Sequence, residues 1–211
     1  MNSISNQKAY HTALVISPPP SLWEQIQSIR KFYDSAYERW MPHINMTFPF
    51  VTENDFDKAH ELLQKEFDDF EAFPLSFNTM DHFTHSEKCV IWLKPECAND
   101  ELNKIEEKII KVIPHCNDLT IKSKDGFQGH LTLGHSDEKY VEKRKNSFLS
   151  KWSPIKFTVN ELYMIIRKGT ENPFYVVKTI RLKGATEKSY CEDINKEMKG
   201  FEKPFYQTNT F

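Results

Sequence analysis

QGHLTLGH (Gln128–His135) is a short run in which apolar and polar residues alternate, and PHINMTF (Pro42–Phe48) is a matching run upstream. Each run has a histidine near its start. In a β-strand, side chains two residues apart share a face, so each strand is expected to present one imidazole beside one hydrogen-bond donor. The residues predicted to share these two faces are His43, Asn45 and Thr47 in the first strand and His130, Thr132 and Gly134 in the second.

Two such faces, one from each half of the chain, suit the chemistry of phosphate esters. One histidine can take a proton from the attacking oxygen while the other gives a proton to the departing oxygen. A neighbouring hydroxyl or amide can donate to the phosphoryl oxygens as their negative charge grows. A single H-x-T triplet arises easily by chance among 8 histidines, whereas two on predicted strands indicate a paired acid and base.

At these residues the sequence resembles the 2H phosphoesterase superfamily. This group comprises 2′-5′ RNA ligase-like proteins and 2′,3′-cyclic nucleotide phosphodiesterases and is named for two H-x-[S/T] motifs. The resemblance spans residues 8–183 and is concentrated in PHINMTFPF and GHLTLGH. The downstream motif, His130 to Thr132, fits the family pattern fully. The upstream motif has Asn45 where Ser or Thr is usual, so either the Asn45 amide or the Thr47 hydroxyl is expected to donate to the phosphate.

The composition is that of a globular protein without a strong overall charge. The chain has 211 residues, 39% hydrophobic residues and a formal net charge of -2, so a nucleic acid would have to bind at a local patch. Its four cysteines lack C-x-x-C spacing, which favours reduced thiols over a disulfide or zinc framework. The N-terminus lacks an apolar signal region, and no run approaches transmembrane length. A soluble protein of the cytoplasm is expected, with the nucleus as the alternative.

The order of predicted elements indicates an α+β fold with two similar halves. The resemblance implies a single bilobal domain over residues 8–183, in which two antiparallel sheets face a central cleft and the helices lie outside. Residues 184–211 fall outside the resemblance and form a C-terminal tail of unassigned role. Ser21, three residues before Glu24, is expected to cap the first helix. Strands are expected at 10–17, 42–48, 75–83, 89–93, 129–135, 155–167 and 174–182, and helices at 21–33, 55–70, 100–113 and 137–152.

Other residues near the motifs carry weaker signals. His130 and His135 are five apart, so in a regular strand they face opposite sides and cannot bind one metal ion. The resemblance implies that an aromatic residue near the central hairpin stacks on a base. Phe83 and Trp92 are the candidates, and core packing is favoured for Trp92. Arg167 or Lys168, at the tip of the last hairpin, could reach a phosphate, although neither spacing nor composition demands it.

The helix expected at 137–152 is the most basic segment of the chain. A solvated helix face is favoured for it over a patch that binds a phosphate backbone. Its charged residues include Lys139, Lys143, Arg144, Lys145 and Lys151 against Glu138 and Glu142.

The motifs and the resemblance predict a metal-independent phosphodiesterase that opens a 2′,3′-cyclic phosphate at an RNA end to a 2′-phosphate, with reversible 2′-5′ RNA ligation as a further activity. By family analogy, His130 is the general base that activates water and His43 is the general acid that protonates the leaving 3′ oxygen. Thr132, with Asn45 or Thr47, would hold the nonbridging oxygens. No cofactor and no metal are expected. The expected partners are RNA or oligonucleotide ends, tRNA fragments among them, and the chain is expected to be a monomer without a membrane partner.

Two other functions fit the same motifs. A 2′-5′ oligoadenylate phosphodiesterase or a 3′-end RNA exonuclease would use the same two histidines on a linear bond. A non-catalytic RNA- or nucleotide-binding module is the second alternative, because Asn45 departs from the usual catalytic pattern.

Overall fold

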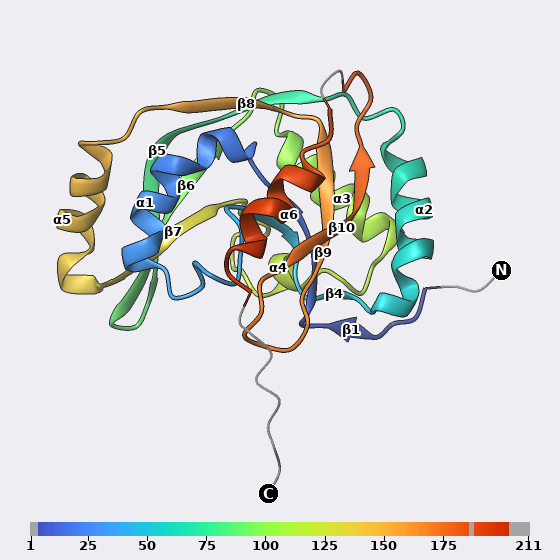
Figure 1. Cartoon of the computed structure of the whole chain (residues 1–211), viewed down its shortest axis with the longest axis horizontal. Helices are drawn as coiled ribbons and strands as arrows, with labels where there is room; N and C mark the ends of the chain where they lie inside the picture. The colour runs from blue at the N-terminus through green and yellow to red at the C-terminus, as the bar shows by residue number, and fades with distance from the viewer. Residues whose placement is uncertain (1–3, 186–187, 203–211) are drawn as a thin grey trace, which may run out of the picture.

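The computed structural model describes residues 4–185 and 188–202 and has an α+β architecture (Figure 1). Its principal sheet has the strand order β10-β9-β2-β3-β7-β6-β5-β8, and β1 and β4 form a separate pair. The strands are β1 (Lys8–Ala9), β2 (Thr12–Ile16), β3 (Ile44–Thr47), β4 (Phe50–Val51), β5 (Phe73–His85), β6 (Lys88–Glu96), β7 (Leu131–Asp137), β8 (Ile155–Val159), β9 (Glu161–Ile166) and β10 (Tyr175–Arg181). The helices are α1 (Trp23–Tyr33), α2 (Phe56–Phe67), α3 (Glu101–Val112), α4 (Asp118–Ile121), α5 (Glu138–Leu149) and α6 (Cys191–Lys199). Among these helices, none combines the length and the apolar character needed to cross a membrane.

The principal sheet consists of two halves that meet at one residue pair. β10-β9-β2-β3 forms one half and β7-β6-β5-β8 forms the other, and all neighbouring strands are antiparallel. Between β3 and β7 the register contains a single partnership, Ile44 with Leu131. The predicted bilobal α+β fold is confirmed, and its two sheets are continuous across this pair.

Strand β8 carries the chain from one half of the sheet to the other. The sequence pattern predicts one strand at 155–167, but the chain divides at Asn160. β8 pairs with β5, Val159 opposite Phe73, whereas β9 pairs with β2 and β10. The burial pattern changes at the same residue, because β8 alternates between buried and exposed positions while β9 is buried almost throughout. In Figure 1, β8 runs along the top of the view between the α5 side and the β9 side.

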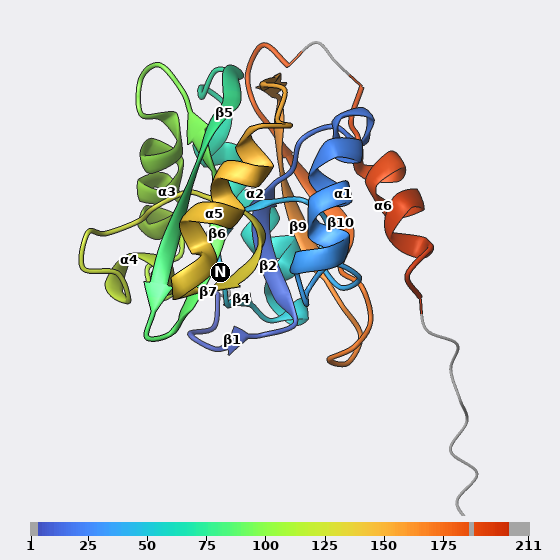
Figure 2. The same ribbon diagram turned by 90° about the vertical axis from the view of Figure 1, so that its left-hand side faces the viewer.

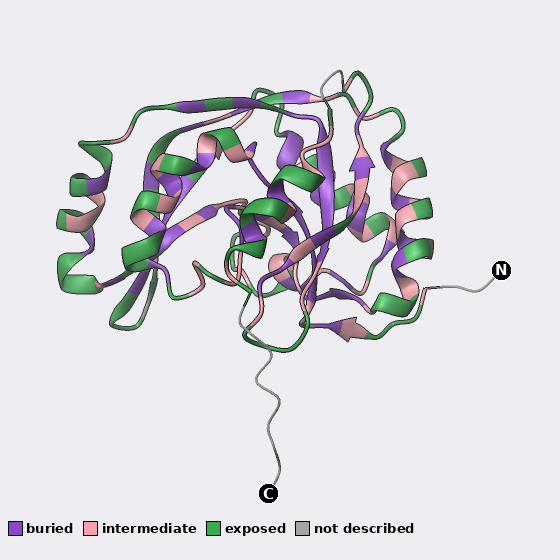
Figure 3. Cartoon of the chain, in the orientation of Figure 1, coloured by how far each residue is buried: buried purple, intermediate pink, exposed green. Residues whose placement is uncertain are grey.

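Part of the 184–211 segment packs on the sheet as helix α6. Its residues Ile194 and Met198 are fully buried in a cluster with apolar residues of β2, β9 and β10. Asn195 attaches the helix to β10, because its side chain accepts a hydrogen bond from Val176 N and donates one to Val176 O, both at 2.8 Å. Alternate residues of β2 belong to the larger core on the opposite face of the sheet. Figure 2 shows α6 beside α1 and β10, and Figure 3 shows the buried central strands behind the exposed outer faces of the helices.

The first helix begins later than the sequence pattern predicts. Ser21 lies in the 3-10 turn Pro20–Leu22, and neither this turn nor α1 has a side-chain capping hydrogen bond, so the predicted capping box is wrong. The prolines at 18–20 direct the chain into this turn, and the Trp23 indole then donates to the Pro18 carbonyl oxygen at 2.8 Å. The helix start is therefore held by a buried indole instead of a serine hydroxyl.

A close contact between β7 and the end of α1 requires a residue without a side chain at position 134. A Cβ atom on Gly134 would lie 2.4 Å from Tyr33 Cβ and 2.7 Å from the Tyr33 carbonyl oxygen. The backbone of Tyr33 cannot move freely, because its ring packs against Phe148 of α5 at 4.9 Å. Gly134 therefore sets the distance between α1 and the strand that carries the second motif.

We expect Gly134→Ala to lower the free energy of unfolding by about 1–3 kcal/mol, as overpacking of a core does. Chemical denaturation followed by circular dichroism measures the change. Gly200→Ala is the matched control, because a Cβ atom there meets only an ordinary contact at 3.5 Å. Equal unfolding midpoints for the two variants would show that α1 moves away from β7 without cost.

Candidate active site

A cleft of about 560 Å³ opens where the two halves of the sheet meet. β3 and β7 are antiparallel at this junction, so His43 lies across from Thr132 and Asn45 lies across from His130. All four residues line the cleft. Each imidazole thus lies across the junction from the hydrogen-bond donor of the other strand, and the two imidazoles lie diagonally opposite each other.

His43 is held in its neutral form by its surroundings. Its Nδ1–H donates to the Met41 carbonyl oxygen at 2.7 Å, which leaves Nε2 as the nitrogen that can gain a proton. The Asn45 amide donates to that Nε2 at 3.1 Å, and the Trp40 ring stacks on the imidazole with the centroids 4.6 Å apart. Burial, with a smaller contribution from the positive charge of Arg30, lowers the pKa of His43 to about 3.

His130 repeats this arrangement in the other half of the sheet. Its Nδ1–H donates to the Gln128 carbonyl oxygen at 2.8 Å, again two residues earlier in the chain. Burial lowers the pKa of His130 below its ordinary value. The Phe83 ring meets the imidazole edge-on with the centroids 5.0 Å apart. The cleft therefore contains two neutral imidazoles of the same tautomer, and each can take up a proton at Nε2.

Asn45, and not Thr47, is the donor of the upstream motif that faces the cleft. β2 pairs Leu14 with Thr47 but pairs the next residue, Val15, with Asn45, so a bulge in β3 shifts the alternation of side chains. Thr47 is 1% exposed, and its hydroxyl donates to the Cys116 carbonyl oxygen at 2.8 Å. The expectation that Thr47 shares the histidine face is wrong. Asn45 Oδ1 is buried and has no hydrogen-bond partner among the described residues.

A second bulge brings a third histidine into the cleft. Thr132 and Gly134 pair with consecutive residues of β6, so Leu133 is an extra residue in β7. His135 consequently lines the same cleft as His130, and the prediction that the two face opposite sides is wrong. Within residues 4–185 and 188–202, no group of three or more His, Cys, Asp or Glu side chains is arranged to hold a metal ion.

Of Phe83, Trp92 and Arg167, each a candidate to contact a base or a phosphate, only Phe83 lines the cleft. Phe83 lines the cleft, whereas Trp92 is 7% exposed and stacks on Phe83 with the centroids 4.8 Å apart, which is core packing. Arg167 is not among the cleft residues. Its guanidinium donates to the Thr170 carbonyl oxygen at 2.7 Å and lies 4.9 Å from the centre of the Phe174 ring. The structure therefore does not bring Arg167 to the position predicted for the phosphate.

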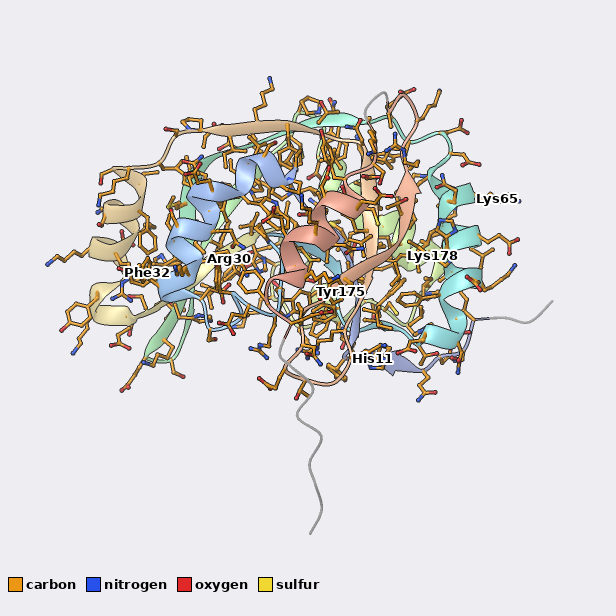
Figure 4. The ribbon with its side chains drawn as sticks, in the orientation of Figure 1. His11, Arg30, Phe32, Lys65, Tyr175 and Lys178 are labelled. Carbon is orange, nitrogen blue, oxygen red and sulfur yellow. The ribbon has the colours of Figure 1, made fainter. Side chains whose placement is uncertain are left out.

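Sequence reasoning missed the charged pairs that line the cleft. Arg30 is 2% exposed, pairs with Asp34 at 2.8 Å and donates to the Trp40 carbonyl oxygen at 3.0 Å. Figure 4 shows Arg30 on α1. A second pair joins Asp118 and Lys122 at 3.0 Å. The spacing of four between the partners was visible in the sequence, but most such pairs are solvated, so spacing alone does not indicate that these line a cleft.

Family and relatives agree with the motifs. The 2′-5′ RNA ligase superfamily model matches residues 18–171, which contain both histidine motifs. A protein of Geobacillus kaustophilus (strain HTA426) named "Putative phosphoesterase" is 29% identical over 122 residues, which are 57% of this chain and 66% of that protein. The chain thus spans slightly less than two thirds of the length of this relative.

Solved structures share the fold. The crystal structure of E. coli LigT complexed with 3′-AMP superposes with a TM-score of 0.56 at 17% identity and covers 84% of this chain and 99% of LigT. The crystal structure of TT0787 of Thermus thermophilus has a TM-score of 0.55 at 12% identity and covers 82% of this chain and 98% of that protein. At these identities the likeness is one of fold.

We expect the fold to lose stability as the pH falls from the ordinary histidine pKa of ~6.5 towards the lowered pKa of His43, about 3. Over this range the unfolded chain binds the proton and the folded chain does not, so stability is full above this range and declines with acidification. Urea denaturation at pH 7 and pH 5 should show a smaller loss for His43→Gln than for the wild type, by up to about 2 kcal/mol. Parallel losses in the two proteins would contradict a neutral His43.

Proposed function

This chain belongs to the 2′-5′ RNA ligase superfamily, and from that premise we propose that it is a metal-independent phosphodiesterase acting on RNA ends. Membership confirms the resemblance predicted from the two motifs, and the name of the Geobacillus relative supports a phosphoesterase activity. The proposed reaction is hydrolysis of a terminal 2′,3′-cyclic phosphate to a 2′-phosphate. The same chemistry would give 2′-5′ RNA ligation when a 5′-hydroxyl takes the place of water.

One observation carries the proposal: two neutral imidazoles with the same tautomer lie across one cleft, each beside a hydrogen-bond donor. Opening a cyclic phosphate requires a proton to leave the nucleophile and a proton to reach the departing oxygen. Two histidines, one on each side of the scissile bond, can perform both transfers. His43 and His130 supply these groups from the two halves of the sheet.

In the proposed reaction, His130 Nε2 takes a proton from water as the water oxygen forms a bond to phosphorus. The bond between phosphorus and O3′ breaks, and His43 Nε2 gives its proton to that oxygen. The phosphate remains on O2′. The two histidines have then exchanged their protonation states, and proton exchange with solvent restores the starting arrangement. In the reverse direction the two roles exchange.

His43 must hold a proton before it can act as the acid, although its pKa in the free chain is about 3. A phosphodiester anion next to Nε2 favours the imidazolium form, and the face of Trp40 also stabilises a cation. We infer that the bound substrate itself raises the pKa of His43. A protonated Nε2 can no longer accept the hydrogen bond from the Asn45 amide, so that side chain turns its amide towards the phosphate and leaves the Nε2–H facing O3′.

The two donors beside the histidines complete the proposed site. The Thr132 hydroxyl makes no hydrogen bond to another of the described residues, so it is available to a nonbridging phosphoryl oxygen. The Asn45 amide is the corresponding donor on the opposite side. Hydrogen bonds that strengthen as negative charge develops lower the barrier directly. Phe83, edge-on to His130, is available for a base of the substrate to stack on.

Two alternative functions would use the same cleft. A linear 2′-5′ or 3′-5′ bond could be cleaved by the same histidines, as in a 2′-5′ oligoadenylate phosphodiesterase or a 3′-end exonuclease. The 3′-AMP in the LigT structure supports a nucleoside phosphate as the ligand class. A nucleotide-binding module without turnover is favoured by one specific observation, namely that Asn45 already occupies Nε2 of His43.

The direct test is incubation of the purified chain, in excess EDTA, with an RNA that ends in a 2′,3′-cyclic phosphate. We expect a 2′-phosphate product, resolved by the position of the terminal phosphate. An unreacted end would overturn this substrate assignment and direct the assay to linear 2′-5′ and 3′-5′ bonds.

We expect His43→Ala and His130→Ala each to lower turnover by a factor on the order of 10² to 10⁴ while the circular dichroism spectrum is unchanged. The wild type should have a bell-shaped pH profile, because one base and one acid are required together. His11→Ala is the control, since the His11 side chain is half-buried, pairs with Glu53 at 3.2 Å and does not line the cleft. Most of the activity surviving in either motif variant would contradict the mechanism.

Substitution of Asn45 tests the departure from the family motif. We expect Asn45→Thr to retain turnover within about tenfold, because a hydroxyl replaces the amide donor, and Asn45→Ala to lower kcat by roughly 10² through loss of that donor. Steady-state kinetics on the cyclic phosphate give both values. If Asn45→Ala is as active as the wild type, this side chain does not contact the phosphate.

A further inference from the structure

The cleft continues onto a neighbouring surface through His135. This residue lines the cleft, its side chain is exposed, and its carbonyl oxygen accepts a hydrogen bond from Arg144 of α5 at 3.0 Å. The Arg144 guanidinium lies over the Tyr33 ring, 4.8 Å from its centre. The end of α1, the end of β7 and helix α5 thus meet beside the cleft.

Aromatic and basic side chains alternate on this neighbouring surface. Tyr140 lies one helical turn before Arg144, so both project from the same side of α5. Tyr140 is 49% exposed, and the Lys139 ammonium lies 4.8 Å from the centre of its ring. At the end of α1, Phe32 is 75% exposed and Tyr33 is 38% exposed. Figure 4 places Phe32 at the end of the molecule where α1 and α5 lie together.

The charges of this region favour an anionic partner. Helix α5 has four basic residues and two acidic ones. Several neighbouring carboxylates already have cationic partners, so their charge is compensated. These pairs are Glu142 with Lys145 at 2.9 Å, Asp137 with Lys88 at 2.5 Å and Asp34 with Arg30 at 2.8 Å. Lys139 and Arg144 lie near the already paired Asp137 and face aromatic rings.

We propose that this surface binds the single-stranded RNA that continues from the nucleotide in the cleft. Exposed rings on which bases stack, interleaved with cations that contact the backbone phosphates, are the means by which proteins hold single strands. The proposal rests on the function proposed above and adds the path that the strand takes beyond its terminal nucleotide. The residues of this α1–α5 track are Phe32, Tyr33, His135, Lys139, Tyr140 and Arg144.

Binding as a function of RNA length tests the track. The probes are 2′-O-methylated RNAs of one, three and six nucleotides with a 3′-phosphate, which bind without being cleaved and compete with a fluorescein-labelled six-nucleotide RNA in an anisotropy assay. On the proposed path, a mononucleotide would occupy the cleft alone, whereas six nucleotides would reach over α5. We expect the longest RNA to bind at least about tenfold more tightly than the shortest, with affinity falling as salt rises. Equal affinity at all lengths would overturn the proposal.

Two variants test the individual contacts. Arg144→Gln and Tyr140→Ala should each weaken binding of the six-nucleotide RNA by about five- to tenfold and leave the mononucleotide unaffected. Arg144→Gln should also reduce the slope of log K against log salt by about 0.7, the change expected for one phosphate contact on a single strand. Lys65→Gln is the matched control, because it removes one positive charge at the opposite end of the molecule (Figure 4). An equal loss in the control would overturn the track as a specific surface.

Turnover of a mononucleoside 2′,3′-cyclic phosphate separates this proposal from the proposed function. Turnover without length-dependent binding would overturn the track and leave the activity in place. Length-dependent binding that requires Arg144, without turnover of any RNA end, would overturn the proposed activity. It would support a non-catalytic protein that binds RNA along the α1–α5 track.

Discussion

A single backbone pairing, between Ile44 and Leu131, joins the two halves of the sheet, and the residues on either side of this pair line the cleft. One residue pair contributes little stability by itself. The junction is therefore held by groups that pack beside it, among them the Arg30 guanidinium bound to the Trp40 carbonyl oxygen and the Thr47 hydroxyl bound to the Cys116 carbonyl oxygen.

The protonation of the two histidines follows from the same junction. Each imidazole donates Nδ1–H to the carbonyl oxygen two residues earlier, a local bond that the strand geometry makes available at both motifs. Burial between the halves then disfavours the charged form of each ring, so the resting site holds two bases and no acid. In the proposed reaction, the negative charge of a bound phosphate ester favours the protonated form of His43, so the acid would form only when the substrate binds.

Charges within the cleft largely cancel, because Arg30 is paired with Asp34 and Lys122 with Asp118. The whole chain carries a formal net charge of -2. A long anionic strand would therefore need a local surface, and the proposed α1–α5 track, with its rings and cations, would supply one next to the cleft. In this proposal the charge-balanced cleft is the site of the reaction, and the basic surface beside it binds the strand.

The α+β class, most strands and helices, and the pairing of His43 with His130 could be predicted from the sequence, because alternation, helical spacing and the two motifs are properties of neighbouring residues. It could not determine the bulges in β3 and β7, which turn Thr47 away from the cleft and His135 towards it. A bulge is defined by the register against a partner strand, and that register depends on residues distant in the chain. The same reason applies to the division at Asn160 and to the burial of Arg30, since both depend on which elements the tertiary structure packs beside them.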